Sequence, residues 1–288
     1  MSAQSFRGRV SAEKLAGLGT AISLGALFLF ISTCRGDEKN EQRRAQLLTQ
    51  MRSLAEQTTV KFAKSERRIE FVKNPVFRYD DQPRRIIDAT IWVWTVAGRP
   101  VAFQKIEAMH HAGTDAPEWC HCFASASPDL LSVAWRDGPP FRSTEPGISF
   151  RPVPDAPAVA GGSAQRKRQA RELVRGFTAR ILLDPGKKMS DELRLLTTPI
   201  FEYSDPKTKE FQGAVFGFAT NGTNSGLLVL VEARGEPDRP VWHFSPARLT
   251  ACGVTLAYRD KKVWEAPFWN ETSFSNWRFF FTPRTPLR

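Results

Sequence analysis

The sequence predicts an α+β protein built from two tandem-duplicated domains, each a mainly antiparallel curved sheet with one packed helix. Three observations lead to this prediction: blocks of similar residues recur in the same order, alternating apolar segments are separated by turn residues, and an apolar stretch precedes the first copy. With 288 residues the chain has room for two ordinary domains. Its hydrophobic fraction of 41% supplies sizeable cores and argues against wholesale disorder.

The internal repeat is the strongest of these observations. The matched blocks are NPVFRYDD (74–81) with TPIFEYSD (198–205), DATIWVWTVAGRPVAFQKIEA (88–108) with GAVFGFATNGTNSGLLVLVEA (213–233), PEW (117–119) with PVW (240–242), and SVAWRDGPPF (132–141) with TLAYRDKKVW (255–264). Four collinear blocks are not expected by chance, so they predict a duplication. The predicted domains are residues 41–151 and 165–288, joined by a linker at 152–164 that is rich in Pro, Ala and Gly.

Each copy is predicted to begin with a short amphipathic helix, at residues 43–57 and 165–179. Apolar runs with β-branched and aromatic residues follow, and they predict antiparallel strands. The turns between these strands are predicted at AGRP (97–100), NGTNSG (221–226) and YRDKK (258–262). A helix followed by paired strands in each copy gives the α+β class.

The N-terminus carries an uncharged apolar stretch, LAGLGTAISLGALFLFI (15–31), after the basic residues Arg7, Arg9 and Lys14. This order predicts a signal-anchor or signal peptide within residues 1–34. An uncleaved anchor is the first interpretation. A buried core helix is disfavoured because the stretch is apolar on all sides.

A lipid anchor is the second interpretation of this segment, and cleaved secretion is the third. ISTC (31–34) resembles a bacterial lipoprotein box, which makes Cys34 a lipid-anchor candidate, although Thr33 fits that box poorly. Any of the three interpretations places the bulk of the chain outside the cytoplasm, in the periplasm or cell envelope. Such a compartment permits disulfides.

The net charge of +11 favours contact with polyanions, and the tightest basic run is Arg166-Lys167-Arg168 with Arg171. No helix-turn-helix, zinc-finger or RNA-binding signature accompanies these charges, so nucleic acid is not the expected partner. The expected partners are the membrane, through the N-terminal segment, and another envelope protein or an acidic polymer. A cytoplasmic nucleic-acid binder is the minor alternative.

The segments ELRLLTTPIFEYSDP, GAVFGFATNGTN and LVLVEAR of the second copy resemble a family of uncharacterised bacterial envelope proteins. These proteins carry an N-terminal hydrophobic segment before one or two such units. The resemblance covers most of residues 165–259, and the first copy adds 43–137. It implies an exported protein with tandem α+β units, and it implies no activity, cofactor or catalytic residue.

One stretch, EAMHHAGTDAPEWCHC (107–122), resembles a metal site, because it holds three of the four histidines and two of the four cysteines. The candidate zinc ligands are His110, His111, Cys120 and Cys122. On a strand, C-x-C places both sulfurs on one face and the intervening histidine on the other. Zinc needs three or four convergent ligands. The second copy has one histidine and no cysteine at the matched positions, so a structural strand is favoured and zinc is the alternative.

Two pairs of polar residues recur at matched positions, Glu107 with Glu232 and Tyr79 with Tyr203. The carboxylates could form a site in each domain, but a structural role at a strand end, in a turn or in an ion pair is favoured. The tyrosines are expected in the core, where their hydroxyls need partners. The sequence lacks a nucleophile elbow, a phosphate loop, H-E-x-x-H and a dinucleotide fingerprint. The predicted function is therefore a membrane-anchored, exported binding or scaffold module that is not an enzyme. The alternative is a metal-dependent hydrolase that uses the His/Cys cluster.

Overall fold

The computed structural model describes residues 40–110, 117–136, 140–184, 186, 189–207, 210–220, 222–236, 238–268, 279–281 and 285–286. Two compact units are distinguished, Met1–Gln46 and Leu47–Arg288, and every contact discussed below lies in the second unit. Within the described residues, no helix is long and apolar enough to cross a membrane. The predicted anchor at 15–31 and Cys34 lie outside these residues.

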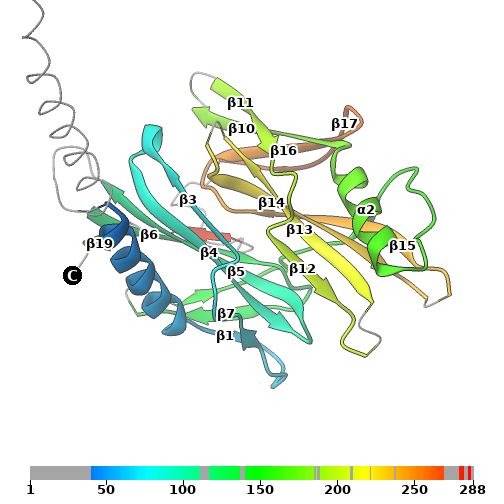
Figure 1. Cartoon of the computed structure of the whole chain (residues 1–288), viewed down its shortest axis with the longest axis horizontal. Coiled ribbons are helices and arrows are strands. Elements are labelled where there is room, and N and C mark those ends of the chain that lie inside the picture. The colour runs from blue at the N-terminus through cyan, green and yellow to red at the C-terminus, as the bar shows by residue number, and fades with distance from the viewer. Residues whose placement is uncertain are drawn as a thin grey trace, which may run out of the picture. The chain divides into compact units, whose positions relative to one another are not determined.

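The first half of the second unit, residues 47–152, is mostly strand (Figure 1). A helix at residues 40–56 leads into it. Its elements are β1 (Thr59–Phe62), β2 (Glu70–Phe71), β3 (Phe77–Asp81), the 3₁₀ helix η1 (Gln82–Arg84), β4 (Ile86–Val96), β5 (Arg99–His110), β6 (Pro117–Ser125), β7 (Leu131–Ala134), β8 (Phe141–Arg142) and β9 (Arg151–Pro152).

The second half, residues 153–268, has a similar order of elements, and two short strands follow it near the C-terminus. The elements are α2 (Ser163–Val174), β10 (Phe177–Asp184), β11 (Met189–Leu195), β12 (Phe201–Ser204), β13 (Phe211–Ala219), β14 (Ser225–Arg234), β15 (Val241–Arg248), β16 (Gly253–Tyr258), β17 (Lys261–Ala266), β18 (Phe279–Phe281) and β19 (Thr285–Pro286).

All the strand pairs in the described residues are antiparallel, so the molecule is an α+β protein that is mostly β. The first half forms a sheet in the order β18-β6-β5-β4-β2, with β3 also paired to β4 and β19 to β6, and a separate sheet β1-β7-β8. The second half forms one sheet in the order β17-β16-β10-β11-β13-β14-β15-β9, with β12 paired to β13. The described residues contain two α-helices.

The same strand pairings occur in both halves. β3-β4-β5-β6 corresponds to β12-β13-β14-β15, and β1-β7-β8 corresponds to β10-β16-β17. Each half also receives a short strand from the segment that follows the other half. β9 pairs with β15 through Pro152 and His243, and β18 pairs with β6 through Phe281 and Cys122.

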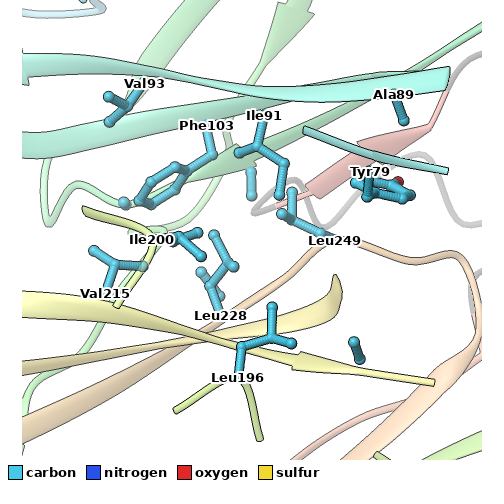
Figure 2. Close-up of a cluster of buried hydrophobic side chains, with 14 of the residues drawn as sticks. Tyr79, Ala89, Ile91, Val93, Phe103, Leu196, Ile200, Val215, Leu228 and Leu249 are labelled. Atoms are coloured by element: carbon cyan, nitrogen blue, oxygen red, sulfur yellow. The ribbon is translucent and has the colours of Figure 1, made fainter. Parts of the chain in front are cut away.

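Three apolar clusters form the core. One lies between the N-terminal helix and the first sheet, and it includes Met51, Trp92 and Ile106. A second lies between α2 and the second sheet. The third lies between the two sheets, where Figure 2 shows Phe103 on one side facing Leu228 and its neighbours on the other. Each main sheet is therefore buried on both faces, by a helix on one side and by the other half on the opposite side.

The second predicted helix was expected to reach residue 179, and this boundary is wrong. α2 ends at Val174, and Phe177 already begins β10. Buried and exposed residues alternate from Phe177 to Ile181, and this stretch pairs with β16, which satisfies its backbone as a strand. Gly176 lies at the junction, where a Cβ atom would lie 2.6 Å from the ring of Tyr258.

Two features predicted as connections have defined structures. Residues 97–98 and 259–260 have positive φ at both central turn positions, as a tight antiparallel hairpin requires. The segment predicted as a linker, 152–164, packs on the second core through Val153, Ala156 and Val159. This segment is therefore part of the second half rather than a free tether.

The shared core between the sheets predicts that both halves unfold in one transition. Phe103 and Leu228 are fully buried there, so Phe103→Ala and Leu228→Ala should each cost about 3–5 kcal/mol in the free energy of unfolding. Urea unfolding followed by circular dichroism measures this. Val241→Ala, at a side chain that is 47% exposed, is the control and should change stability by less than about 0.5 kcal/mol. Two separate transitions, with each variant shifting only one, would contradict a shared core.

Candidate functional site

The structure describes three of the four predicted zinc ligands, and two of these share one strand face. Cys120 packs in the cluster between the sheets and Cys122 contacts the carbonyl of Leu249 in that cluster, so both lie on one face of β6, as the C-x-C spacing predicts. His121 contacts Gln104 on the other face. β5 and β6 are neighbouring strands, but His110 pairs with Pro117, three residues along from Cys120. By strand alternation, His110 faces away from the two sulfurs. His111 lies outside the described residues.

The two cysteines face a buried lysine and a buried glutamate instead. In the register of β5 and β6, Lys105 is the partner of Cys122 and Glu107 is the partner of Cys120. Lys105 Nζ lies 3.2 Å from Glu107 Oε1. All four side chains are at most 4% exposed. Within the described residues, no three His, Cys, Asp or Glu side chains are grouped so that they could hold a metal ion. Zinc binding by this stretch therefore stays a prediction.

Tyr79 completes this first polar cluster by reaching across one strand. Tyr79, Ala89 and Glu107 share one row across β3, β4 and β5. Because Ala89 is small, the Tyr79 hydroxyl passes over it and donates to Glu107 Oε1 at 2.6 Å. The second half contributes Asn224, whose Oδ1 lies 3.1 Å from the same hydroxyl and 3.2 Å from Lys105 Nζ.

The second half contains an equivalent cluster. Tyr203, Gly213 and Glu232 share one row across β12, β13 and β14, and the Tyr203 hydroxyl donates to Glu232 Oε2 at 2.9 Å. A Cβ on Gly213 would lie 2.5 Å from that hydroxyl, so this position admits only glycine without movement of Tyr203. The first half contributes Arg99, which lies 2.9 Å from the Glu232 carboxylate.

A second arginine, on the same strand as Glu232, also contacts the Glu232 carboxylate. Arg234 Nη1 donates to Glu232 Oε1 at 3.2 Å. The guanidinium groups of Arg99 and Arg234 both stack on the ring of Phe150, at 5.1 and 4.3 Å from its centroid. His243 is the register partner of Glu232, at the position that corresponds to Cys120.

Burial dominates the electrostatics of both clusters. It raises the pKa of Tyr79, with the Glu107 carboxylate adding to the shift. Burial alone would lower the pKa of Lys105, but Glu107 offsets this and the net shift is upward. Burial raises the pKa of Cys122 to about 12, so its thiol is neutral and a poor nucleophile at neutral pH. The same cause raises the pKa of Glu232 to about 7, although Arg99 opposes it.

These side chains lie between the two sheets and bond to one another. A substrate would reach them only if the halves separated. Their arrangement satisfies buried polar groups, and it offers neither a reactive thiolate nor an exposed base.

β10, β11, β16 and β17 lie at one end of the second sheet (Figure 1). Residues on and beside these strands line an open groove of about 620 Å³. Its lining is mostly apolar, with a few polar side chains. The lining residues are Arg180, Ile181, Leu182, Ser190, Gly253, Val254, Thr255, Glu265, Ala266, Pro267 and Phe268. A volume of this size is in the range that small-molecule ligands occupy.

The basic run on α2 is largely engaged within the chain. Lys167 and Arg171 both contact the Glu202 carboxylate, at 2.6 and 3.3 Å. Arg166 Nε donates to the carbonyl of Ala160 at 2.6 Å. These contacts make the run a poorer candidate for a polyanion site than its sequence suggests.

No known family model matches the chain, and no curated protein or solved structure matches it significantly. The function is therefore argued from the two polar clusters and the groove.

Sequence reasoning placed Tyr79 and Tyr203 in the core and favoured a structural role for Glu107 and Glu232, but it predicted neither the burial of the two carboxylates nor their pairing with the tyrosines. It did not identify Lys105, Arg99 or Asn224. Lys105 lies in a strand and the other two lie at or beside turns, and nothing in the sequence indicates that these polar side chains contact the clusters. It also missed the groove, whose lining residues are up to about 90 positions apart in sequence.

The raised pKa of Glu232 predicts that its contribution to stability depends on pH. The folded state holds this proton up to about pH 7, whereas an unperturbed glutamate loses it near 4.5, so the contribution falls as the pH rises from about 4.5 to 7. This rise in the pKa of Glu232 corresponds to a change of about 3 kcal/mol in the free energy of unfolding between low and high pH. Glu232→Gln should therefore flatten the pH dependence of the urea midpoint between pH 5 and 8, and it should not destabilise the protein at pH 8. A Glu232→Gln variant that is strongly destabilised at pH 8, with an unchanged pH slope, would contradict this.

Proposed function

We propose that the chain is a tandem duplication that serves as a membrane-anchored, exported binding or scaffold module in the cell envelope, and that it is not an enzyme. The duplication is supported by the equal strand pairings of the two halves and by the matched Tyr–Glu pairs. In each pair the tyrosine crosses one small residue to reach a glutamate on the next strand but one.

The observation that supports a binding function is a contrast in solvent access. The two polar clusters are buried, whereas the groove is open to solvent. The residues with potentially reactive side chains are at most 4% exposed, and Glu107 contacts both Tyr79 and Lys105. These residues are Tyr79, Lys105, Glu107, Cys120 and Cys122. The groove over β10, β11, β16 and β17 is open but pairs no nucleophile with a base. A surface of this kind binds rather than reacts.

The proposed location and partners rest on the sequence. The apolar stretch 15–31 with its basic flank supports anchoring with the bulk of the chain outside the cytoplasm. The net charge of +11 supports an acidic polymer or another envelope protein as partner. Binding to an acidic polymer would weaken steeply with added salt.

The intact mass of the full-length protein, purified from the membrane fraction and measured natively and then denatured, tests this function. We expect the protein in that fraction after a high-salt wash, with residues 1–34 retained and without a metal-dependent mass difference. A lipid-sized mass increase on Cys34 would replace the helical anchor by a lipid anchor. Recovery in the soluble cytoplasmic fraction would overturn the proposal.

The competing function, a zinc-dependent hydrolase, gives a different result in the same measurement. It predicts a native mass higher by one zinc ion, which is lost in Cys120→Ser and Cys122→Ser. The matched control is Cys252→Ser, because Cys252 is partly exposed and lies outside β6. Zinc retained by the control and lost by both other variants would overturn the non-enzymatic proposal.

A further inference from the structure

The groove over β10, β11, β16 and β17 has a defined polar end. Arg180 and Thr255 are register partners on β10 and β16, and Glu265 on β17 continues the same row. Arg180 Nη2 donates to Ser190 Oγ at 3.1 Å, which orients the guanidinium. Its other N–H groups remain for a ligand. Glu192, the register partner of Arg180 on β11, is not among the lining residues.

The charge of this polar end favours an anion. Glu265 forms an ion pair with Lys262 at 2.9 Å, which neutralises the carboxylate in the lining. Among the described lining residues, Arg180 is therefore the charged side chain that has no ion pair. A guanidinium matches a carboxylate through two parallel hydrogen bonds.

The remaining surface of the groove is apolar and shaped by a glycine. A Cβ on Gly253 would lie 3.3 Å both from Leu182 Cβ and from the backbone nitrogen of Phe268, so glycine leaves room between them. The carbonyl of Pro267 accepts a hydrogen bond from Arg248 at 2.6 Å, which fixes this rim. Phe268 is 38% exposed and so presents apolar surface at this rim.

The two central strands of the groove, β10 and β16, offer no backbone partners to an extended peptide. β10 is paired on both sides, with β11 and β16, and β16 is paired with β10 and β17. Their N–H and C=O groups are used in the sheet, so a bound peptide backbone would lose water without gaining partners. A ligand with one polar head and an apolar remainder avoids this loss.

We propose that the groove binds a single-chain amphiphile with a carboxylate head, of the fatty-acid type. The head pairs with Arg180, and the chain lies over Leu182, Gly253 and Phe268. This inference rests on the proposed binding function and names the ligand class of that groove.

Isothermal titration of the purified full-length protein with decanoate, below its micellar concentration, tests the inference. We expect saturable binding at one site, weakened at least tenfold by Arg180→Gln, because a hydrogen-bonded charge pair is lost. Arg180 is exposed, so this variant should fold, and its melting curve verifies that. Decanol should bind at least tenfold more weakly than decanoate.

The matched control is Lys61→Gln. Lys61 pairs with Ser132 in the first half as Arg180 pairs with Thr255 in the second, and it is not among the residues that line the groove. This variant should bind decanoate with unchanged affinity. Absence of saturable binding, equal binding of decanol, or equal losses in both variants would overturn the inference. None of these outcomes bears on membrane anchoring or zinc content, so the proposed function fails or stands separately.

Discussion

Each half of the molecule carries a carboxylate that is buried on the face turned toward the other half. Burying such a charge is costly unless hydrogen bonds and opposite charges accompany it. Each carboxylate receives a tyrosine hydroxyl from its own sheet, and each cluster also receives a side chain from the other half. Asn224 reaches Tyr79 and Lys105, and Arg99 reaches Glu232. The rest of the interface depends on these two reciprocal contacts, because neither cluster is complete within one half.

The contacts of Asn224 and Arg99 with the opposite half fix how the two sheets meet. Arg99 begins β5 directly after the β4–β5 turn, and Asn224 lies between β13 and β14, so each hairpin turn lies beside the polar cluster of the other half. The apolar side chains between the sheets supply most of the burial, but apolar contacts are not directional. The buried hydrogen bonds add the register that apolar packing lacks. The exchanged strands β9 and β18 connect the halves in the same reciprocal way.

The sequence predicted the local features well and the contacts between halves poorly. Turn residues, alternation and the repeat placed the hairpins and the paired strands, since these signals lie within short stretches. The C-x-C spacing correctly put Cys120 and Cys122 on one face. What they face could not be predicted, because Lys105 and Glu107 become their neighbours only through the β5–β6 register, and Asn224 is 102 residues beyond Cys122. The helix predicted to reach residue 179 ended early, since pairing with β16 outweighed local helix propensity.

The interface between the halves is the structural centre of the molecule, and the groove at one end of the second sheet is left for binding. The central claim is that each half supplies a side chain to the polar cluster of the other, and a double-mutant cycle on Arg99 and Glu232 tests that claim most directly. Arg99→Ala, Glu232→Gln and the double variant are unfolded by urea at pH 8, where Glu232 is ionised. The account predicts a coupling energy of more than about 1 kcal/mol, as contacting charged groups show. Additive effects, with a coupling energy near zero, would contradict it.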